Sequence, residues 1–169
     1  MEVLLNDSRI NLRSRDNRGF TAFRVAIDHH HLTAARSLQQ KDPSLFLECD
    51  NTGRNVLHSS VQTGDCKAVF FLIQIGVDMN APVRDSEALS PLHIGITAGI
   101  LEDVLRSMIL AGASVSAVTK QKQTGLHWPF CTIQPTLLRC LLENGALPNA
   151  QDADGNTGIQ AWLPVDLDC

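Results

Sequence analysis

Short apolar stretches separated by polar turns recur along the chain with a period of about 34 residues. In the first stretch of a period the apolar residues are spaced as on one face of a helix, as with Leu57 and Val61. The second stretch reads LIQIGVDMNA, MILAGASVSA and LLENGALPNA at residues 72–81, 108–117 and 141–150. A glycine such as Gly76 suits the left-handed position that follows a helix. The pattern therefore predicts two short helices in each period, with turns between them.

A four-residue slot marks the start of the first helix in each period. It reads NVLH, SPLH and TGLH at residues 55–58, 90–93 and 124–127, with a weaker copy, TAFR, at 21–24. A Ser or Thr at the first position can cap the helix, and Pro91 fits the first helical turn. A turn precedes the slot and reads DNRG, DNTG and DADG at residues 16–19, 50–53 and 152–155. Three elements in phase predict a repeat protein whose units are stabilised by stacking on their neighbours.

These elements resemble the ankyrin repeat, in which a turn and T-P-L-H precede a short helix and a second helix ends in L-L-x-x-G-A. The resemblance implies an all-α solenoid of stacked helix-turn-helix pairs with finger loops. It divides the chain into a partial preceding repeat at 1–15, repeats at 16–49, 50–84 and 85–118, a divergent repeat at 119–151, and a truncated repeat or frayed tail at 152–169. Because the chain starts and stops inside repeats, we expect it to be a segment of a longer array.

Two repeats depart from this pattern. Repeat one has Arg24 in place of the histidine and reads LQQKDPSLF where L-L-x-x-G-A is expected, so we expect it to be looser there. Pro129 falls inside the first helix of repeat four, where it costs roughly 3 kcal/mol, and predicts a broken or very short helix. Pro135 falls where the second helix starts and is tolerated there. Residues 128–135 and 158–169 have the length expected of a repeat but lack its residue pattern. Either genuine divergence or a reading-frame artefact in the gene model would explain this.

Small residues and histidines have predicted structural roles. Ala26, Ser60 and Gly95 are expected to let neighbouring helices approach closely. The resemblance implies that the slot histidines bridge turn and helix backbones by hydrogen bonds: His58, His93 and His127. Stacked repeats lie roughly 10 Å apart, too far for three histidines to share a metal whose ligand bonds are about 2 Å. No phosphate-binding, dinucleotide-binding, zinc-protease or nucleophile-elbow motif is present, so we expect no enzyme activity, cofactor or metal.

Composition narrows the class of partner. Hydrophobic residues make up 44% and charged residues 19%, as in a folded soluble protein. The net charge of −4 and the pI near 5.8 give no case for binding nucleic acid or an anionic membrane. The longest apolar run, residues 68–73, is too short to enter and cross a bilayer. Five scattered cysteines without a C-x-x-C pair indicate reduced thiols in the cytoplasm.

The expected function is therefore protein binding by a rigid concave face. In the ankyrin family, partner contacts come from the finger tips and the exposed side of the first helix. The resemblance places there Asn17, Arg18, Phe20, His29, Asn51, Arg54, Gln62, Glu87, Leu89 and Lys120. Aromatic residues and arginine dominate such interfaces, which favours Arg18, Phe20 and Arg54 as the main contacts.

Two finer hypotheses rest on resemblance alone. DNRGFTAFRVAIDH and the pair LAGASV and TKQKQTGLH resemble the rabankyrin type, long cytosolic proteins with a BTB domain, many ankyrin repeats and a FYVE finger. This resemblance implies an adaptor on early endosomes that binds an activated Rab GTPase, a small GTPase; the residues given contain neither the BTB domain nor the FYVE finger. As an alternative, LIQIGVDMN resembles substrates of asparaginyl hydroxylases and places Asn80 in the modified position, with Asn149 a weaker match.

Overall fold

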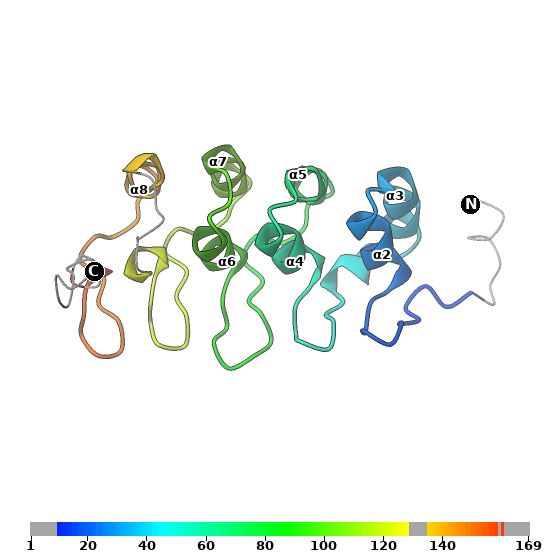
Figure 1. The fold of residues 1–169 in the computed structure, drawn as a ribbon, viewed down its shortest axis with the longest axis horizontal. Coiled ribbons are helices and arrows are strands. Elements are labelled where there is room, and N and C mark those ends of the chain that lie inside the picture. Colours follow the sequence, from blue (N-terminus) through cyan, green and yellow to red (C-terminus); the bar gives the residue numbers. More distant parts are fainter. Residues whose placement is uncertain (1–9, 129–134, 159, 161–169) are drawn as a thin grey trace, which may run out of the picture.

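The fold is a single row of stacked helix pairs, described by a computed structural model for residues 10–128, 135–158 and 160. The regular elements of these residues are α2 (Ala22–Asp28), α3 (Leu32–Lys41), η1 (Pro43–Leu47), α4 (Val56–Gln62), α5 (Cys66–Gln74), α6 (Pro91–Ala98), α7 (Glu102–Leu110), η2 (Gly125–His127) and α8 (Pro135–Glu143). Figure 1 shows α2, α4, α6 and η2 in an inner layer and α3, α5, α7 and α8 in an outer layer. Loops project from the inner layer, away from the outer one. The predicted all-α solenoid is confirmed.

The loops before the first helices form a row of fingers. We number them finger one to finger five, at residues 16–20, 50–54, 85–89, 119–123 and 152–156. Isolated bridges close the first and last of them, between Arg15 and Thr21 and between Gln151 and Thr157. The fingers and the exposed sides of the inner-layer helices together are called the finger face.

Each inner helix begins where its capping residue satisfies the first backbone amides. The side chains of Thr21 and Thr124 accept hydrogen bonds from the N–H groups of Arg24 and Leu126. Ser90 and Asn55, at the starts of α6 and α4, do the same for the N–H groups of His93 and His58. Capping at Thr21, Ser90 and Thr124 was predicted from the sequence and is confirmed.

The slot histidines return a hydrogen bond to the capping residue. Nδ1 of His58 accepts the N–H of Asn55 at 3.0 Å, and its Nε2 lies 2.7 Å from the Ala81 carbonyl oxygen. His127 likewise joins Thr124 to the Asn156 carbonyl. Nδ1 of His93 accepts the N–H of Ser90, but its buried Nε2 has no hydrogen-bond partner among the described residues. The predicted bridge between turn and helix is therefore complete at His58 and His127.

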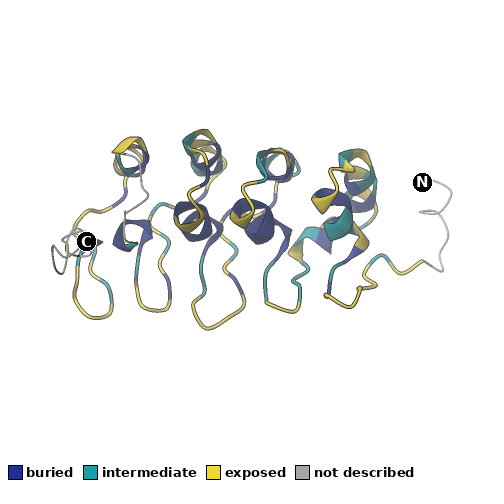
Figure 2. Ribbon diagram, in the orientation of Figure 1, coloured by how far each residue is buried: buried dark blue, intermediate teal, exposed yellow. Residues whose placement is uncertain are grey.

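One apolar core runs through the whole stack. Figure 2 shows α4, α6 and η2 mostly buried, α2 partly exposed and the finger tips exposed. Leu57 of α4, Leu72 of α5 and Leu105 of α7 are fully buried, so both layers contribute to the core. A Cβ added at Gly95 would lie 2.8 Å from Cδ2 of Leu105, so this position must be small for α6 and α7 to pack. The predicted close approach at Gly95 is confirmed.

The two divergent repeats keep their place in the row. Repeat one ends in η1 where a looser segment was expected; Asp42 caps it through the Ser44 N–H, and Leu45 is buried beneath it. In repeat four the described first helix is only η2, three residues long. Trp128 is extended, with ψ 135°, the conformation favoured before a proline. The helix α8 begins at Pro135, as predicted.

Several predicted features lie outside the described residues. They are most of the partial repeat at 1–15, the segment with Pro129 at 129–134, and residues 159 and 161–169 of the truncated repeat. Across the described ranges, no helix has the length and hydrophobicity of a bilayer span.

Candidate protein-binding face

The expected contact residues lie on the finger face. Asn17 and Arg18 are in finger one, Asn51 and Arg54 in finger two, and Glu87 and Leu89 in finger three. Lys120 is in finger four, while His29 and Gln62 lie at the carboxyl ends of α2 and α4. The stacking therefore collects side chains from four repeats on one side of the molecule. These side chains are not equally free to contact a partner, because several of them have contacts within the chain.

Phe20 is held between two arginines. The guanidinium carbons of Arg18 and Arg24 lie 4.6 and 4.5 Å from the centroid of its ring. A cation over an aromatic face is attracted by the ring quadrupole, by about 0.5–1 kcal/mol at an exposed site. The ring itself is half-buried. Phe20 and the two guanidinium groups that lie over it form one cluster on the finger face.

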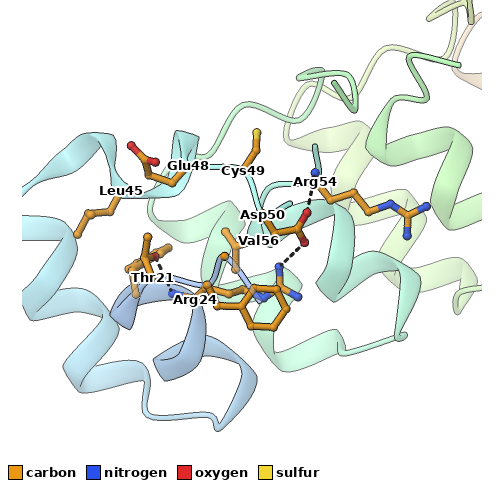
Figure 3. Close-up of a pocket in the computed structure, with 11 residues that line it drawn as sticks. Thr21, Arg24, Leu45, Glu48, Cys49, Asp50, Arg54 and Val56 are labelled. Atoms are coloured by element: carbon orange, nitrogen blue, oxygen red, sulfur yellow. Dashed lines mark hydrogen bonds and ion pairs between the residues drawn. The ribbon is translucent and has the colours of Figure 1, made fainter. Parts of the chain in front are cut away.

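Arg24 connects repeat one to repeat two. Its Nε donates to both carboxylate oxygens of Asp28, at 2.8 and 3.0 Å, and its Nη1 lies 3.8 Å from a carboxylate oxygen of Asp50 (Figure 3). Sequence reasoning missed this role for Arg24, which occupies the slot of the histidine. The four-residue spacing from Arg24 to Asp28 was the available signal, because residues so spaced face each other on a helix.

The hollow beside Arg24 is not a ligand pocket. It is lined by residues of the first two fingers, η1 and the helices α2 and α4, including Phe20, Leu45 and Val56, and its volume is about 10 Å³. That space holds about one water molecule. The residues around it act as a joint between repeats one and two, and their outer atoms form part of the finger face.

The finger carboxylates are used within their own turns. Asp16 accepts hydrogen bonds from the N–H groups of Phe20 and Arg18. Both bonds lower the pKa of Asp16, and the bond from Phe20 has the larger effect. Burial acts to raise the pKa of Asp50, but hydrogen bonds from Thr52 and from the Arg54 N–H outweigh it and lower that pKa. Both aspartates are therefore ionised at neutral pH and have internal donors.

Backbone hydrogen bonds join neighbouring fingers. The N–H of Arg84 donates to the Gly53 carbonyl at 3.0 Å, and that of Ala153 donates to the Gln121 carbonyl at 2.8 Å. Lys120 donates twice to finger three, from its N–H to the Glu87 carbonyl and from Nζ to the carbonyl of Asp85. Fingers two and three, three and four, and four and five are thereby held in register. A rigid face loses little entropy on binding.

Three expected contacts are less available than their sequence position indicates. Leu89 is half-buried and packs against the core. The ammonium group of Lys120 is already bonded to the Asp85 carbonyl. His29 is exposed and its ring stacks on that of His31, with centroids 6.3 Å apart.

Asn80 bridges two repeats. Its Nδ2 donates to the Gly112 carbonyl at 2.8 Å, and its Oδ1 accepts the N–H of Ser114 at 2.7 Å. The residue is exposed, yet both polar atoms of its amide are occupied. Asn80 therefore has a structural role that its place in the sequence did not reveal.

A larger groove lies at the end of the stack formed by α2 and α3. Its volume is about 870 Å³, and its apolar lining includes Ala22, Val25 and Ala34. The counterparts of Ala22 and Ala34 one repeat later, Val56 and Ala68, are fully buried between repeats. The lining of the groove thus corresponds to the surface that the following repeats bury against a neighbour.

Neither metal ligands nor activated thiols mark another site in the described chain. No group of three His, Cys, Asp or Glu side chains in these ranges is placed to hold a metal ion. Cys49, Cys66 and Cys140 are free thiols. Burial raises the pKa of Cys49 and of Cys140, which leaves these thiols protonated at neutral pH.

Comparison with known proteins agrees with this geometry. A family model described as ankyrin repeats (3 copies) matches residues 1–83. The chain belongs to the ankyrin-repeat family. The ankyrin-repeat domain of Bcl-3 superimposes with a TM-score of 0.78 and 22% identity, covering 94% of this chain and 70% of that one, which shows the shared fold. Ankyrin repeats form protein-interaction modules, and this one consists of the finger face and the stack behind it.

Three relatives match most of this ankyrin-repeat chain. Rabankyrin-5 of Mus musculus is 36% identical over 124 residues, 73% of this chain, and Rabankyrin-5 of Homo sapiens matches equally. B-cell lymphoma 3 protein of Homo sapiens is 28% identical over 76% of the chain and is covered to 29% of its own length. The chain spans 10% of the length of the Rabankyrin-5 proteins. The resemblance to the rabankyrin type is thus supported at the level of sequence.

Proposed function

We propose that the chain acts without enzymatic activity of its own, as an adaptor segment that holds a protein partner on the finger face of repeats one and two. The observation that carries the proposal is the arginine-clamped Phe20, flanked by Arg54 of finger two. This arrangement is ordered before any partner arrives. Interfaces obtain most of their binding energy from a few aromatic and arginine side chains of this kind.

A triple variant tests the choice of face. Arg18, Phe20 and Arg54 are changed together to alanine, and partners are captured by proximity labelling and by pull-down with the full chain. A matched control changes Lys67 and Arg139, exposed cations on the outer helices α5 and α8. We expect the triple variant to lose its main partners and the control to keep them, with both folded by circular dichroism. A triple variant that keeps every partner would show that another surface is used.

We further propose that the partner is an activated Rab GTPase and that the protein works in the cytoplasm on early endosomes. The support is the similarity to Rabankyrin-5 over 73% of the chain. The test presents the chain to a panel of purified Rab GTPases loaded with GDP or with a non-hydrolysable GTP analogue. Preference for one GTP-loaded member, reduced in the triple variant, is the expected result. Equal or absent binding of both nucleotide forms would count against a Rab effector.

Hydroxylation of Asn80 is the second candidate. It is supported by the exposure of this residue and by the spacing L-x-x-x-x-x-D-x-N. Because both amide atoms are hydrogen-bonded to the next repeat, we expect modification to require local opening of that contact. Co-expression with an asparaginyl hydroxylase followed by peptide mass spectrometry tests this, with Asn149 as the internal comparison. An unmodified Asn80 peptide would rule the proposal out.

A further inference from the structure

We infer that the finger face of repeats one and two recognises an acidic polypeptide segment. The inference rests on the proposed function and adds the chemistry of the partner. The patch has no net positive charge, because Arg18, Arg24 and Arg54 are matched in number by Asp16, Asp28 and Asp50. The inference rests instead on which hydrogen-bonding groups of the patch point outward.

The acceptors of this patch are used internally. Asp50 has only 10% of its side chain exposed and accepts the N–H groups of Thr52 and Arg54. Asp16 accepts two backbone N–H groups of its own turn, and Asp28 accepts the Nε of Arg24. Asp50 therefore has little capacity to accept a hydrogen bond from the solvent side. Asp16 and Asp28, whose side chains are 38% and 36% exposed, are each paired with an arginine of the patch.

The donors, in contrast, face outward. Arg18 has 68% of its side chain exposed; its Nε is bonded to Asp16, and its two terminal nitrogens have no partner among the described residues. Arg54 donates from one terminal nitrogen to the neutral side chain of Gln62, and no carboxylate of the described chain pairs with it. Phe20 fixes Arg18 by stacking. The patch thus presents oriented guanidinium donors, which bind carboxylates with two parallel hydrogen bonds.

The extent of this donor patch favours a short polypeptide segment over a long polyanion. Beyond repeat two the fingers carry four acidic residues against two lysines, a net charge of −2; the acidic residues are Asp85, Glu87, Asp152 and Asp154, and the lysines are Lys120 and Lys122. These charges would repel a nucleic acid laid along the row of fingers, and the chain as a whole carries −4. A segment with one or two carboxylates near Arg18 and Arg54 meets no such repulsion.

A random-peptide display library, presented to the immobilised full chain, tests the inference. We expect the enriched peptides to be richer in Asp and Glu than the starting library. Affinity for a synthesised acidic peptide should fall roughly five- to thirty-fold in the R18Q/R54Q variant, as for two exposed charged contacts, and should weaken with added salt. The K67Q/R139Q variant removes the same charge from the outer layer and should bind normally. Urea unfolding of both variants checks that they are folded.

The possible failures have different meanings. Enriched peptides without acidic bias, if their binding is lost in the triple variant of Arg18, Phe20 and Arg54, would overturn the inference and leave the proposed function standing. Equal weakening by R18Q/R54Q and K67Q/R139Q would overturn it as well, because the effect would then be one of net charge. A single-stranded oligonucleotide that binds as tightly as the acidic peptide would replace the polypeptide by a polyanion. A library that yields no binder at all would overturn the inference and leave the proposed function standing, because capture of folded partners tests that function separately.

Discussion

Acidification should destabilise the stack through the buried slot histidine of repeat two. His58 is 1% exposed, and this burial lowers its pKa from 6.5 to about 4. The hydrogen bond to the Ala81 carbonyl raises the pKa in part, and the charge of Arg54 lowers it further. The folded state therefore holds His58 neutral at a pH where the unfolded chain already binds a proton. Stability from this group is fully present above pH 6.5 and is lost progressively as the pH falls toward 4.

The size of the effect follows from the two pKa values. At pH 5 the difference between about 4 in the folded state and 6.5 in the unfolded state corresponds to a loss of about 2 kcal/mol, rising to about 3 kcal/mol at lower pH. Burial lowers the pKa of His93 as well, so the wild type should lose more than this. The carboxylates with lowered pKa values, such as Asp42 at about 2, lose their contribution only at more acid pH. The interval from pH 7.5 to 5 therefore isolates the histidines.

Urea unfolding of the wild type and the His58→Gln variant at pH 7.5 and pH 5 measures this contribution. The variant should be less stable at pH 7.5, because the two hydrogen bonds of His58 are disturbed, and the gap to the wild type should shrink by about 2 kcal/mol at pH 5. His29→Gln, on the exposed turn after α2, should follow the wild type at both pH values. A gap that stays constant between the two pH values would refute the reasoning.

Three further predictions concern the joints between repeats, each measured as the free energy of urea unfolding. Gly53→Ala should cost about 2–4 kcal/mol, since φ is +77° and the added Cβ would lie 2.6 Å from the carbonyl oxygen of Arg84. Gly64→Ala, at φ +68° in open space, should cost only about 1–2 kcal/mol, and equal losses would contradict the clash. Asn80→Ala should cost about 1–3 kcal/mol, because two hydrogen bonds between repeats disappear, whereas Asn149→Ala should change stability by less than about 0.5 kcal/mol. His30→Gly should stabilise by about 0.5–1 kcal/mol, because His30 has φ +56°, and a loss of stability would show that its side chain matters more than the strain.

Local signals in the sequence were sufficient for the helices and their order. Ser90 and Pro91 start α6, and Pro135 starts α8, because capping and proline geometry act within three or four residues of a helix end. The recurrence of these signals every 34 residues or so was enough to predict a stack, since no single pair of helices can bury its own apolar face. The ending of repeat one was the exception. Pro43 and Asp42 form the start of η1 there, and its stability depends on burying Leu45 against α2 and α4.

The chain's own sequence thus determined the fold, the capping residues and the side of the molecule on which the fingers lie. Only the tertiary structure decided which finger-face residues are free, because that depends on contacts between residues about one repeat apart. The bonds of Asn80 to repeat three and of Lys120 to finger three are of this kind. So is the orientation of Arg24 between Phe20 and Asp50. A shift of a few ångströms between stacked repeats would break each of these contacts and leave every helix of the sequence pattern unchanged.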